Sequence, residues 1–487
     1  AKAVVTLWVR VSDSRPLSVD RSPREPADLS RRFIPLTALL LCTSSQAAEV
    51  EFEGSYRARA RAIDTLSLDH TLANQEGLSA YFQHRLWLRP RFILNDDVAL
   101  FVDFKGLDNV VWGSNPIDSD NPVPNAPPTF EQAQAAPTSD TDSTAPLSDF
   151  TIWRVWGDVN TPVGRFRFGR IPLHWGRGIW QNDGVTTNPF FADYGDSADR
   201  VQWEYLIQEQ FFVQLAGDVN SEGFLNAVDD TTAFNAVMAY RSEQVVAGLN
   251  TQLAHTVDKF EESTRFNLFT ADLALDATLG KLNVSVEALG QFGGGSLPNG
   301  LNNVTVTAFG AAGAGTLDLG AFKVGVEGGM ASGDGNDGDQ KLKTFTFDRD
   351  YSVGMMLFEL PMPTLNAAAA TDENGNRTHE AALTGNALSN AIYFRPAISR
   401  SIIDGLDVEA SFLGARTAKI PARLDGRGSY GMELGLGLKY TAIEHFETGL
   451  QFGAFLPGTF YREYADDLYE NFDDPAFGTQ FTTRIHF

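Results

Sequence analysis

The last eleven residues of the chain, Phe477 to Phe487, read F-G-T-Q-F-T-T-R-I-H-F. In an extended strand, successive side chains point to opposite faces. One face then carries Phe477, Thr479, Phe481, Thr483, Ile485 and Phe487, and the other carries Gly478, Gln480, Thr482, Arg484 and His486. The segment predicts a strand with one apolar and one polar face, which suits a membrane-spanning strand or the edge strand of a soluble sandwich.

A C-terminal aromatic residue that closes such a strand resembles the assembly signal of bacterial outer-membrane β-barrels. In those proteins the final strand pairs with the first strand, so no edge of the sheet is left open. The resemblance implies that Phe487 is needed for assembly. It also implies two partners, the barrel assembly machinery and the lipid of the outer membrane.

The rest of the chain repeats this alternation. From Val50 onward, segments of about ten to fifteen residues alternate apolar and polar side chains. Short turns, such as residues 95–97, alternate along the chain with long polar loops, such as residues 108–148. Counting the segments predicts about eighteen strands, with both termini on the side of the short turns, as in bacterial barrels. The predicted fold is an all-β, transmembrane, antiparallel up-and-down β-barrel with short periplasmic turns and long extracellular loops.

The amino-terminal segment, residues 1–47, predicts a leader with a signal peptide that is removed. Arg31 and Arg32 precede the apolar run Phe33–Leu41, and small residues at 45–47 suit a cleavage site. Cys42 directly follows the run, which also resembles a lipoprotein signal, although the residue before it is bulky. This apolar run is shorter than the roughly 18 residues of a membrane helix. The barrel is therefore expected to span 48–487 in the bacterial outer membrane.

Composition narrows the function classes. The only cysteine lies in the expected leader, so the mature chain has neither a disulfide nor a cysteine metal site. Subtracting the leader's 7 basic and 4 acidic residues from 38 and 62 leaves 31 and 58, a net charge of −27. Such acidity argues against nucleic acid as a partner. The histidines are scattered without a recognisable serine or aspartate motif, so the chain is not expected to be an enzyme.

Arginines gather on one face of the first two predicted strands. Arg57, Arg59 and Arg61 lie opposite Tyr56 and its apolar neighbours on the first strand. The second strand repeats the pattern with Arg85, Arg89 and Arg91. An arginine that faces lipid at midplane costs roughly 2–4 kcal/mol, so these side chains must face the lumen. The basic wall is predicted to continue with Arg154, Arg165, Arg167 and Arg200.

Two interpretations of this wall stay open. Arginine suits bidentate contact with carboxylate or phosphate, so the wall predicts a pathway for anionic solutes or glycans. Alternatively, wall carboxylates neutralise the arginines and leave a packed ionic lining without selectivity. The carboxylates that could do so are Glu51, Glu53, Asp103, Asp158 and Glu204.

The stretch 169–178 reads G-R-I-P-L-H-W-G-R-G and breaks the alternation of the preceding strand. Its pattern G-R-x-x-x-x-W-G-x-G resembles the alginate-export family of eighteen-stranded, anion-conducting outer-membrane barrels. A related group carries S-G-D-G-N in a later loop, as at 332–336 here. The resemblance implies that Arg170 and Arg177 line the lumen or its constriction. The other constriction residues of that family cannot be aligned with this sequence, so the question of whether the substrate is a polysaccharide stays open.

Loop residues give further candidates. Trp175 and Trp180 suit either a membrane-interface belt or stacking on a ligand. Oxygen ligands on a glycine-rich turn suit Ca²⁺, although a solvated acidic loop is the favoured interpretation. The residues of this predicted Ca²⁺ site are Asp334, Asn336, Asp337 and Asp339. Asp193, Asp196 and Asp199 are likewise expected to be solvated. The segment 344–363 is too apolar for an exposed loop, so 332–386 is expected to fold partly inward.

These observations predict an outer-membrane channel, a porin or exporter, for anionic solutes or anionic polysaccharide. The alternative is a structural or receptor barrel whose lumen is closed by its loops. No cofactor is expected other than the loop Ca²⁺.

Overall fold

The computed structural model describes residues 49–65, 68, 76–112, 150–185, 193–221, 230–258, 264–297, 301–335, 339–360, 387–420, 426–461 and 474–487. The leader expected at 1–47 lies outside the described residues. Among the residues described, no helix has the length and apolar composition that a membrane crossing would take.

Within those ranges, eighteen long strands follow one another: β1 (Glu49–Thr65), β2 (Glu76–Asn95), β3 (Val98–Val111), β4 (Phe150–Thr161), β5 (Gly164–Pro172), β6 (Ser197–Ile207), β7 (Phe211–Ser221), β8 (Thr231–Arg241), β9 (Val245–Asp258), β10 (Thr264–Leu279), β11 (Leu282–Leu297), β12 (Leu301–Asp318), β13 (Lys323–Ala331), β15 (Ala391–Ile403), β16 (Leu406–Thr417), β17 (Ser429–Tyr440), β18 (Phe446–Pro457) and β19 (Ala476–His486). A two-residue strand, β14 (Lys341–Leu342), pairs in parallel with β12. A short 3-10 helix, η4 (Thr459–Tyr461), follows β18.

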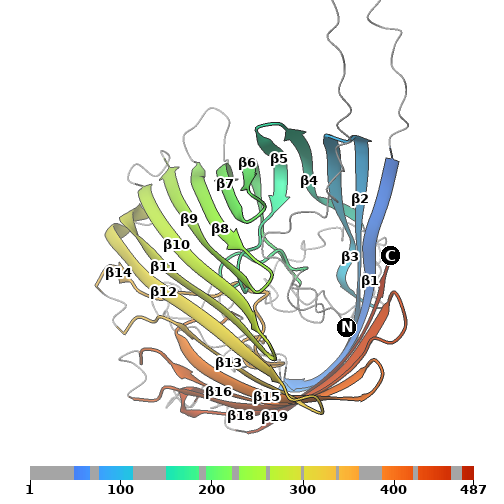
Figure 1. Cartoon of the computed structure of the whole chain (residues 1–487). Helices are drawn as coiled ribbons and strands as arrows, with labels where there is room; N and C mark the ends of the chain where they lie inside the picture. Colours follow the sequence, from blue (N-terminus) through green and yellow to red (C-terminus); the bar gives the residue numbers. More distant parts are fainter. Residues whose placement is uncertain are drawn as a thin grey trace, which may run out of the picture.

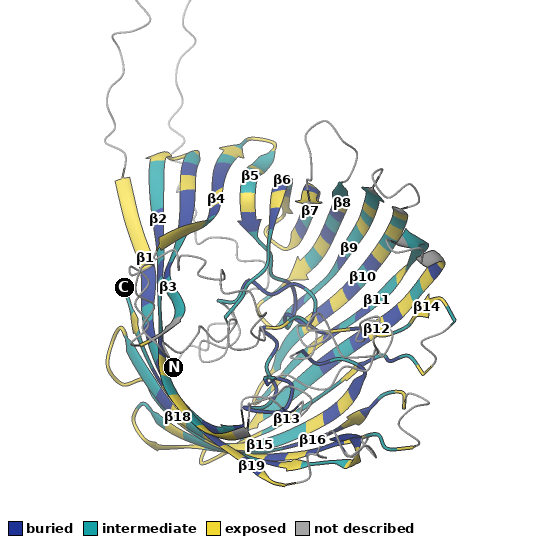
Figure 2. Ribbon diagram, turned by 180° about the vertical axis from the view of Figure 1, so that it is seen from behind, coloured by how far each residue is buried: buried dark blue, intermediate teal, exposed yellow. Residues whose placement is uncertain are grey.

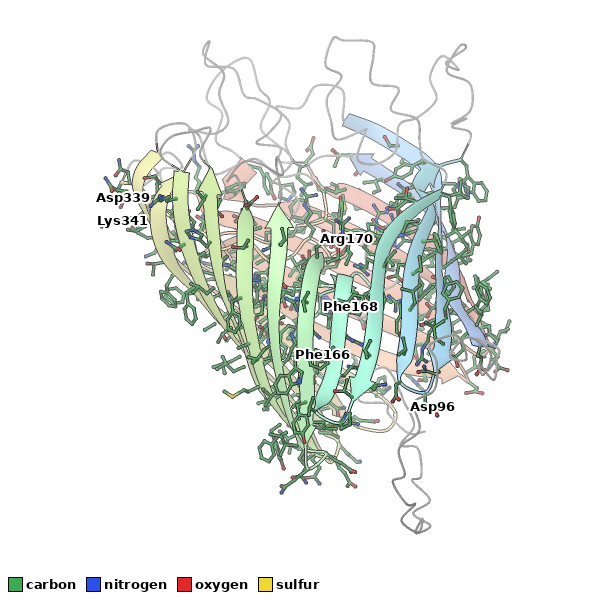
Figure 3. All side chains as sticks on the ribbon, turned by 90° about the horizontal axis from the view of Figure 1, so that it is seen from above. Asp96, Phe166, Phe168, Arg170, Asp339 and Lys341 are labelled. Carbon is green, nitrogen blue, oxygen red and sulfur yellow. The ribbon has the colours of Figure 1, made fainter. Side chains whose placement is uncertain are left out.

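Each long strand pairs antiparallel with its neighbour in sequence, and β1 pairs with β19, which closes the sheet (Figure 1). The prediction of a closed barrel of eighteen antiparallel strands is confirmed. Closure satisfies every strand edge, which matters because lipid offers no hydrogen bonds to an open edge. The predicted short turns lie at one end of the barrel. Figure 3 shows Asp96, in the β2–β3 turn, at the end opposite Asp339 and Lys341.

The seam between β1 and β19 is completed by the C-terminal residue. The N–H of Gly54 donates to the carbonyl oxygen of Phe487 at 2.8 Å, and the N–H of Phe487 donates back at 3.1 Å. A Cβ at position 54 would lie 2.7 Å from Cε2 of the Phe487 ring. Glycine is therefore required at position 54 for the aromatic ring to lie across the seam. The predicted pairing of the last strand with the first is confirmed.

Side chains alternate between a lipid-facing exterior and the lumen, and Figure 2 shows this as bands of exposed and buried residues along the strands. Strand β17 is an example. Its side chains Leu434 and Leu436 are 51% and 50% exposed, whereas Glu433, the residue before Leu434, is 3% exposed. Leucine on the exterior meets acyl chains at no cost, whereas a charge there is expensive. The alternation therefore places Glu433 inside the barrel, together with Arg57, Arg59 and Arg61 of β1.

Two loops enter the lumen and contact the wall. The first inner loop comprises residues 173–185 and 193–196, between β5 and β6, and the second comprises 345–360, between β14 and β15. Trp175 of the first loop packs against wall residues of β7 to β10. The second loop forms the largest apolar cluster, with wall residues of β11, β12, β15, β16 and β18. These two loops position the site described next.

Candidate functional site

The arginine wall faces the lumen. Arg59 is 1% exposed, and Arg57, Arg61 and Arg89 are buried with it. The register places Arg57 directly opposite Arg85 of β2 on one side and Arg484 of β19 on the other. We call Arg85, Arg57 and Arg484 the arginine row. Like charges directly opposite each other destabilise a sheet, and a carboxylate beside each arginine offsets that repulsion: Asp108 for Arg85, Asp193 for Arg57 and Glu447 for Arg484.

A small cavity of about 40 Å³ lies beside the arginine row, between the wall and the first inner loop. It is lined by Ser55, Arg57, Arg85, Trp87, Trp153, Gly184, Val185 and Arg484. Sequence reasoning placed Arg484 on the polar face of the last strand but did not join it to the wall. The signal that was missing is the register of the β1–β19 seam, which no local pattern encodes.

Wall carboxylates neutralise much of the arginine wall. Arg89 binds Asp103 through Nε at 2.5 Å and Nη2 at 2.7 Å, and Arg91 contacts Glu51 at 3.0 Å. The remaining pairs are Arg85 with Asp108, Arg165 with Glu204, Arg167 with Asp158, and Arg200 with Asp218. Glu51, Asp103, Asp158 and Glu204, which were named as neutralising candidates, take this role. The interpretation as an ionic lining therefore describes much of the wall.

Asp193 of the first inner loop supplies the counter-charge for the centre of the wall. Its carboxylate contacts Arg57, and Oδ2 lies 2.9 Å from Nη2 of Arg59. Burial alone would raise the pKa of Asp193, but the guanidinium groups of Arg59 and Arg57 hold that pKa well below its usual range. The expectation that Asp193 is solvated is wrong, because the loop folds inward and places its side chain on the arginines.

Arg154 fastens the first inner loop to the wall. Its guanidinium is fully buried and lies over the ring of Trp153, with Cζ 3.3 Å from the ring centroid. Nη2 donates to the backbone carbonyl oxygens of Asp183 and Asp196 at 3.1 and 2.8 Å. The structure thus gives Arg154 a loop-anchoring contact in addition to its place in the lumen wall.

Arg170 does not face the lumen. It lies on the same face of β5 as Phe166 and Phe168, toward the end of the strand that leads into the loop (Figure 3). Its side chain is 53% exposed and pairs with Asp199 on β6 at 2.7 Å. The expectation of a lumen or constriction residue was wrong. The strand keeps its alternation through Gly169, so Arg170 stays on the outer face.

Arg177, by contrast, lies inside the barrel. Its Nη2 donates to Oε1 of Glu327 on β13 at 2.7 Å and to the hydroxyl of Tyr351 in the second inner loop at 3.2 Å. The turn that carries it is held by Glu287 of β11, whose carboxylate accepts the N–H of Arg177 at 2.5 Å. A Cβ at Gly176 would lie 2.5 Å from that carboxylate, so the close approach requires glycine there. Arg177 thus lies inside the barrel, and its role as a pathway or constriction residue stays a prediction.

Glu433 of β17 holds the second inner loop in the same way. Its two carboxylate oxygens accept the N–H groups of Met355, Met356 and Leu357 at 2.6 to 3.1 Å. The apolar residues that made an exposed loop implausible are buried against the wall: Phe345, Phe347, Tyr351, Met355, Met356, Leu357 and Phe358. The expectation of inward folding is confirmed for residues 345–360. The rest of 332–386 is described only at 332–335 and 339–344.

The two inner loops also bind each other. Asp350 accepts the N–H groups of Asp193 and Tyr194 at 2.7 and 3.1 Å. Asp196 and Asp348 share a side-chain hydrogen bond. Burial raises the pKa of Asp348 to about 9, with the charges of Asp196 and Asp350 adding to it, and burial raises the pKa of Asp196 to about 6. The expectation that Asp196 is solvated is wrong, because one proton joins it to the second loop.

The two tryptophans of the first inner loop lie away from the lipid interface. Trp175 is 2% exposed and packs on Phe212, Val237, Val246 and Ala274, while Trp180 packs against the apolar cluster of the second loop. The belt interpretation is wrong for both, since neither side chain reaches the exterior. A stacking role toward a ligand stays a prediction.

The predicted Ca²⁺ site gains no support from the part of it that is described. Asp334 and Asp339 both contact the ammonium group of Lys343, at 3.2 and 3.3 Å. Asn336 and Asp337 lie outside the described residues. Among the residues described, no three histidine, cysteine, aspartate or glutamate side chains form a metal-binding group. The Ca²⁺ site therefore stays a prediction.

Comparison with known proteins identifies the fold. No protein-family model matches the chain, and no curated protein matches it significantly. Among solved structures, Acinetobacter baumannii OccAB2 is 8% identical with a TM-score of 0.51, covering 90% of this chain and 98% of that chain. Pseudomonas aeruginosa OpdL is 10% identical with a TM-score of 0.50, covering 90% and 99%. At these identities the likeness is one of fold.

The closed sheet of eighteen long strands and its apolar exterior define a bacterial outer-membrane β-barrel. The resemblance to the alginate-export family is not supported by these comparisons and stays a prediction.

Proposed function

We propose that this barrel is an outer-membrane channel of the porin type that passes anionic solutes, with anionic glycans as the larger candidates. The observation that carries the proposal is the arginine row. On adjacent strands, Arg85 and Arg484 each lie in register with Arg57, and a cavity lies beside the three side chains. An anion that reaches this cavity could compete with the carboxylates that pair with these arginines and accept bidentate hydrogen bonds in their place.

The inner loops shape the selectivity of such a channel. Asp193 is held between Arg57 and Arg59, so part of the basic wall is already matched by a carboxylate. A solute carboxylate of similar geometry would compete for the same guanidinium groups. Field focusing between low-dielectric walls would raise the local anion concentration, most strongly at low salt. At 0.1 M salt the screening length is about 10 Å, so dilution extends the field across the lumen.

A second candidate is a structural or receptor barrel closed by its loops. The observation that favours it is the second inner loop, whose apolar residues are packed against the wall and whose backbone is tied to Glu433. The ion pairs of the wall also favour a closed barrel, because they neutralise arginines that would otherwise attract anions.

Single-channel recording in planar bilayers separates these candidates. We expect a measurable conductance and a reversal potential, in a salt gradient, that favours anions. Replacing Arg57, Arg85 and Arg484 together by Gln should shift the reversal potential toward cations and weaken current block by an oligouronate. Arg170→Gln is the matched control, because its guanidinium lies on the outer face. A cation-selective parent channel would refute the anion pathway, and a barrel without conductance would establish the closed alternative.

A further inference from the structure

Two cavities lie in the periplasmic half of the lumen, away from the arginine wall. The larger, about 270 Å³, is lined by the β12–β13 turn at 320–322 and by residues of β13, β15, β16, β17 and β18. The smaller, about 120 Å³, lies against β12, β13, β15 and β16 and extends to Glu327 and Arg395. Lys323, Ser399 and Glu409 line both. The cavities are therefore adjoining parts of one space, which we call the vestibule.

Glu327 is the point at which the vestibule meets the inner loops. Its Oε1 accepts hydrogen bonds from Arg177 Nη2 and from the Tyr351 hydroxyl, both at 2.7 Å. The Tyr393 hydroxyl of β15 adds a third contact at 3.3 Å. Arg177 comes from the first inner loop and Tyr351 from the second, while Tyr393 and Glu327 belong to the wall. The four side chains form a closed polar cluster, which we call the Glu327 cluster.

Beyond the Glu327 cluster, the same wall is covered. Ala308 and Ala312 of β12 share the inward face with the vestibule residues but are 1% and 2% exposed, because the second inner loop lies on them. A Cβ at Gly310 would lie 2.4 Å from the ring of Phe345. The open part of this wall thus ends where the second inner loop begins.

Charged contacts link the vestibule to the arginine row. Lys439, in the vestibule lining, lies 3.4 Å from Glu447, and Glu447 lies 3.3 Å from Arg484. A polar arc therefore runs over adjacent strands from Lys323 to Arg57. The arc mixes basic and acidic side chains, because Asp407 and Glu409 line the vestibule together with Lys323 and Lys439.

We propose that solutes cross the periplasmic half of the barrel through the vestibule, along β13, β15 and β16, and that the Glu327 cluster closes its inner end. The inference rests on the proposed channel function and specifies its route. Lys323, Arg395 and Lys439 would meet the anionic group of the solute. The arginine row then lies to one side of the route, as an anion-attracting surface that feeds it.

Cysteine accessibility tests the route in the full-length chain. Cys42 is the only cysteine, so a Cys42→Ser background gives a thiol-free protein. In that background Ser399→Cys places a thiol in the vestibule, and Ala312→Cys places one on the covered part of the same face. The probe is 2-sulfonatoethyl methanethiosulfonate, added from the periplasmic side, with labelling counted by mass spectrometry and current recorded in parallel.

We expect Ser399→Cys to be labelled with loss of most of the current, and Ala312→Cys to stay unlabelled. Labelling of Ser399→Cys without any fall in current would overturn the proposed route while leaving the channel function standing. Equal labelling of both thiols would overturn the boundary at the second inner loop. A parent barrel without current would refute the channel function, and the route with it, whatever the labelling.

Glu327→Gln tests the closure in a second way. The substitution keeps the volume but leaves Arg177 and Arg395 without the carboxylate between them. We expect higher conductance and a reversal potential shifted toward anions. Tyr393→Phe, which removes one hydroxyl and no charge, is the matched control and should leave selectivity unchanged. An unaltered current in Glu327→Gln would show that the cluster does not lie on the route.

Discussion

Replacing Asp193 by Asn is the most informative single change, because this loop carboxylate contacts two arginines of the wall. Oδ2 of Asp193 lies 2.9 Å from Nη2 of Arg59, the other oxygen contacts Arg57, and its side chain is only 14% exposed. Its depressed pKa means that Asp193 contributes stability above its ordinary pKa, and that this stability is lost only as pH falls through the lower folded value. At neutral pH the full effect of the substitution should therefore be seen.

The size of the effect follows from the geometry. At 2.9 Å and an effective dielectric constant of about 20, one such contact is worth roughly 6 kcal/mol of Coulomb attraction. Desolvation offsets most of this attraction, and measured losses on removing one partner of a buried pair are about 3–5 kcal/mol. We expect Asp193→Asn to destabilise the barrel by that amount and to leave the wall with one more uncompensated positive charge.

Two measurements check this. Heat- or urea-induced unfolding, followed by loss of the heat-modifiable band, should show the destabilisation, and the reversal potential should shift toward anions. Asp199→Asn is the matched control, because Asp199 is 51% exposed and pairs with Arg170 on the outer face. Exposed pairs contribute about 0–1 kcal/mol, so the control should change little. Equal effects of the two substitutions, or a shift toward cations in Asp193→Asn, would refute the reasoning.

Three further predictions concern the seam and the loops. Deleting Phe487 should sharply reduce folded barrel in outer-membrane fractions, because it removes both backbone hydrogen bonds to Gly54; an unchanged yield of heat-modifiable protein would contradict this. Glu433→Ala should raise conductance and protease sensitivity, since three N–H groups lose their acceptor at about 1–3 kcal/mol each. If conductance stays the same, apolar contacts alone hold the second inner loop. The raised pKa values of Asp196, about 6, and Asp348, about 9, favour the protonated, docked loops, so docking should weaken as pH rises from about 4 through these values. Current recorded across this range should become larger or noisier at alkaline pH, and Asp348→Asn should remove the change above neutral pH.

The barrel could be predicted from the sequence because its determinants are local. Alternation along each strand is set by the contrast between lipid and lumen. The polarity of Arg57 or Leu434 alone therefore predicts whether that side chain faces the lumen or the lipid. The length of a turn also predicts the end of the barrel at which it lies, because the short turns lie at the periplasmic end. These features need no knowledge of distant residues, which is why strand number and orientation agree with the structure.

The site depended on long-range geometry and was predicted only in part. Arg484 joins the arginine row through a strand register that depends on closure of the whole sheet. Asp193 and Asp196 were misplaced because their burial depends on where a loop packs, which their acidic neighbourhood did not indicate. For Arg170 the family motif predicts the lumen and the alternation of its strand predicts the outer face, and the structure follows the alternation. The apolar composition of 344–363 was the one loop signal strong enough to predict inward folding.

The seam between β1 and β19 has a consequence for the order of folding. Arg61 and Gln480, which are hydrogen-bonded across it, are 419 positions apart in the chain. Such a contact cannot form until nearly all of the polypeptide has been delivered, and proteins dominated by distant pairings fold slowly. Until then the first strand presents unpaired backbone groups along one edge, which invite pairing with other chains. We therefore predict that delivery of the last strand sets the rate at which the barrel closes.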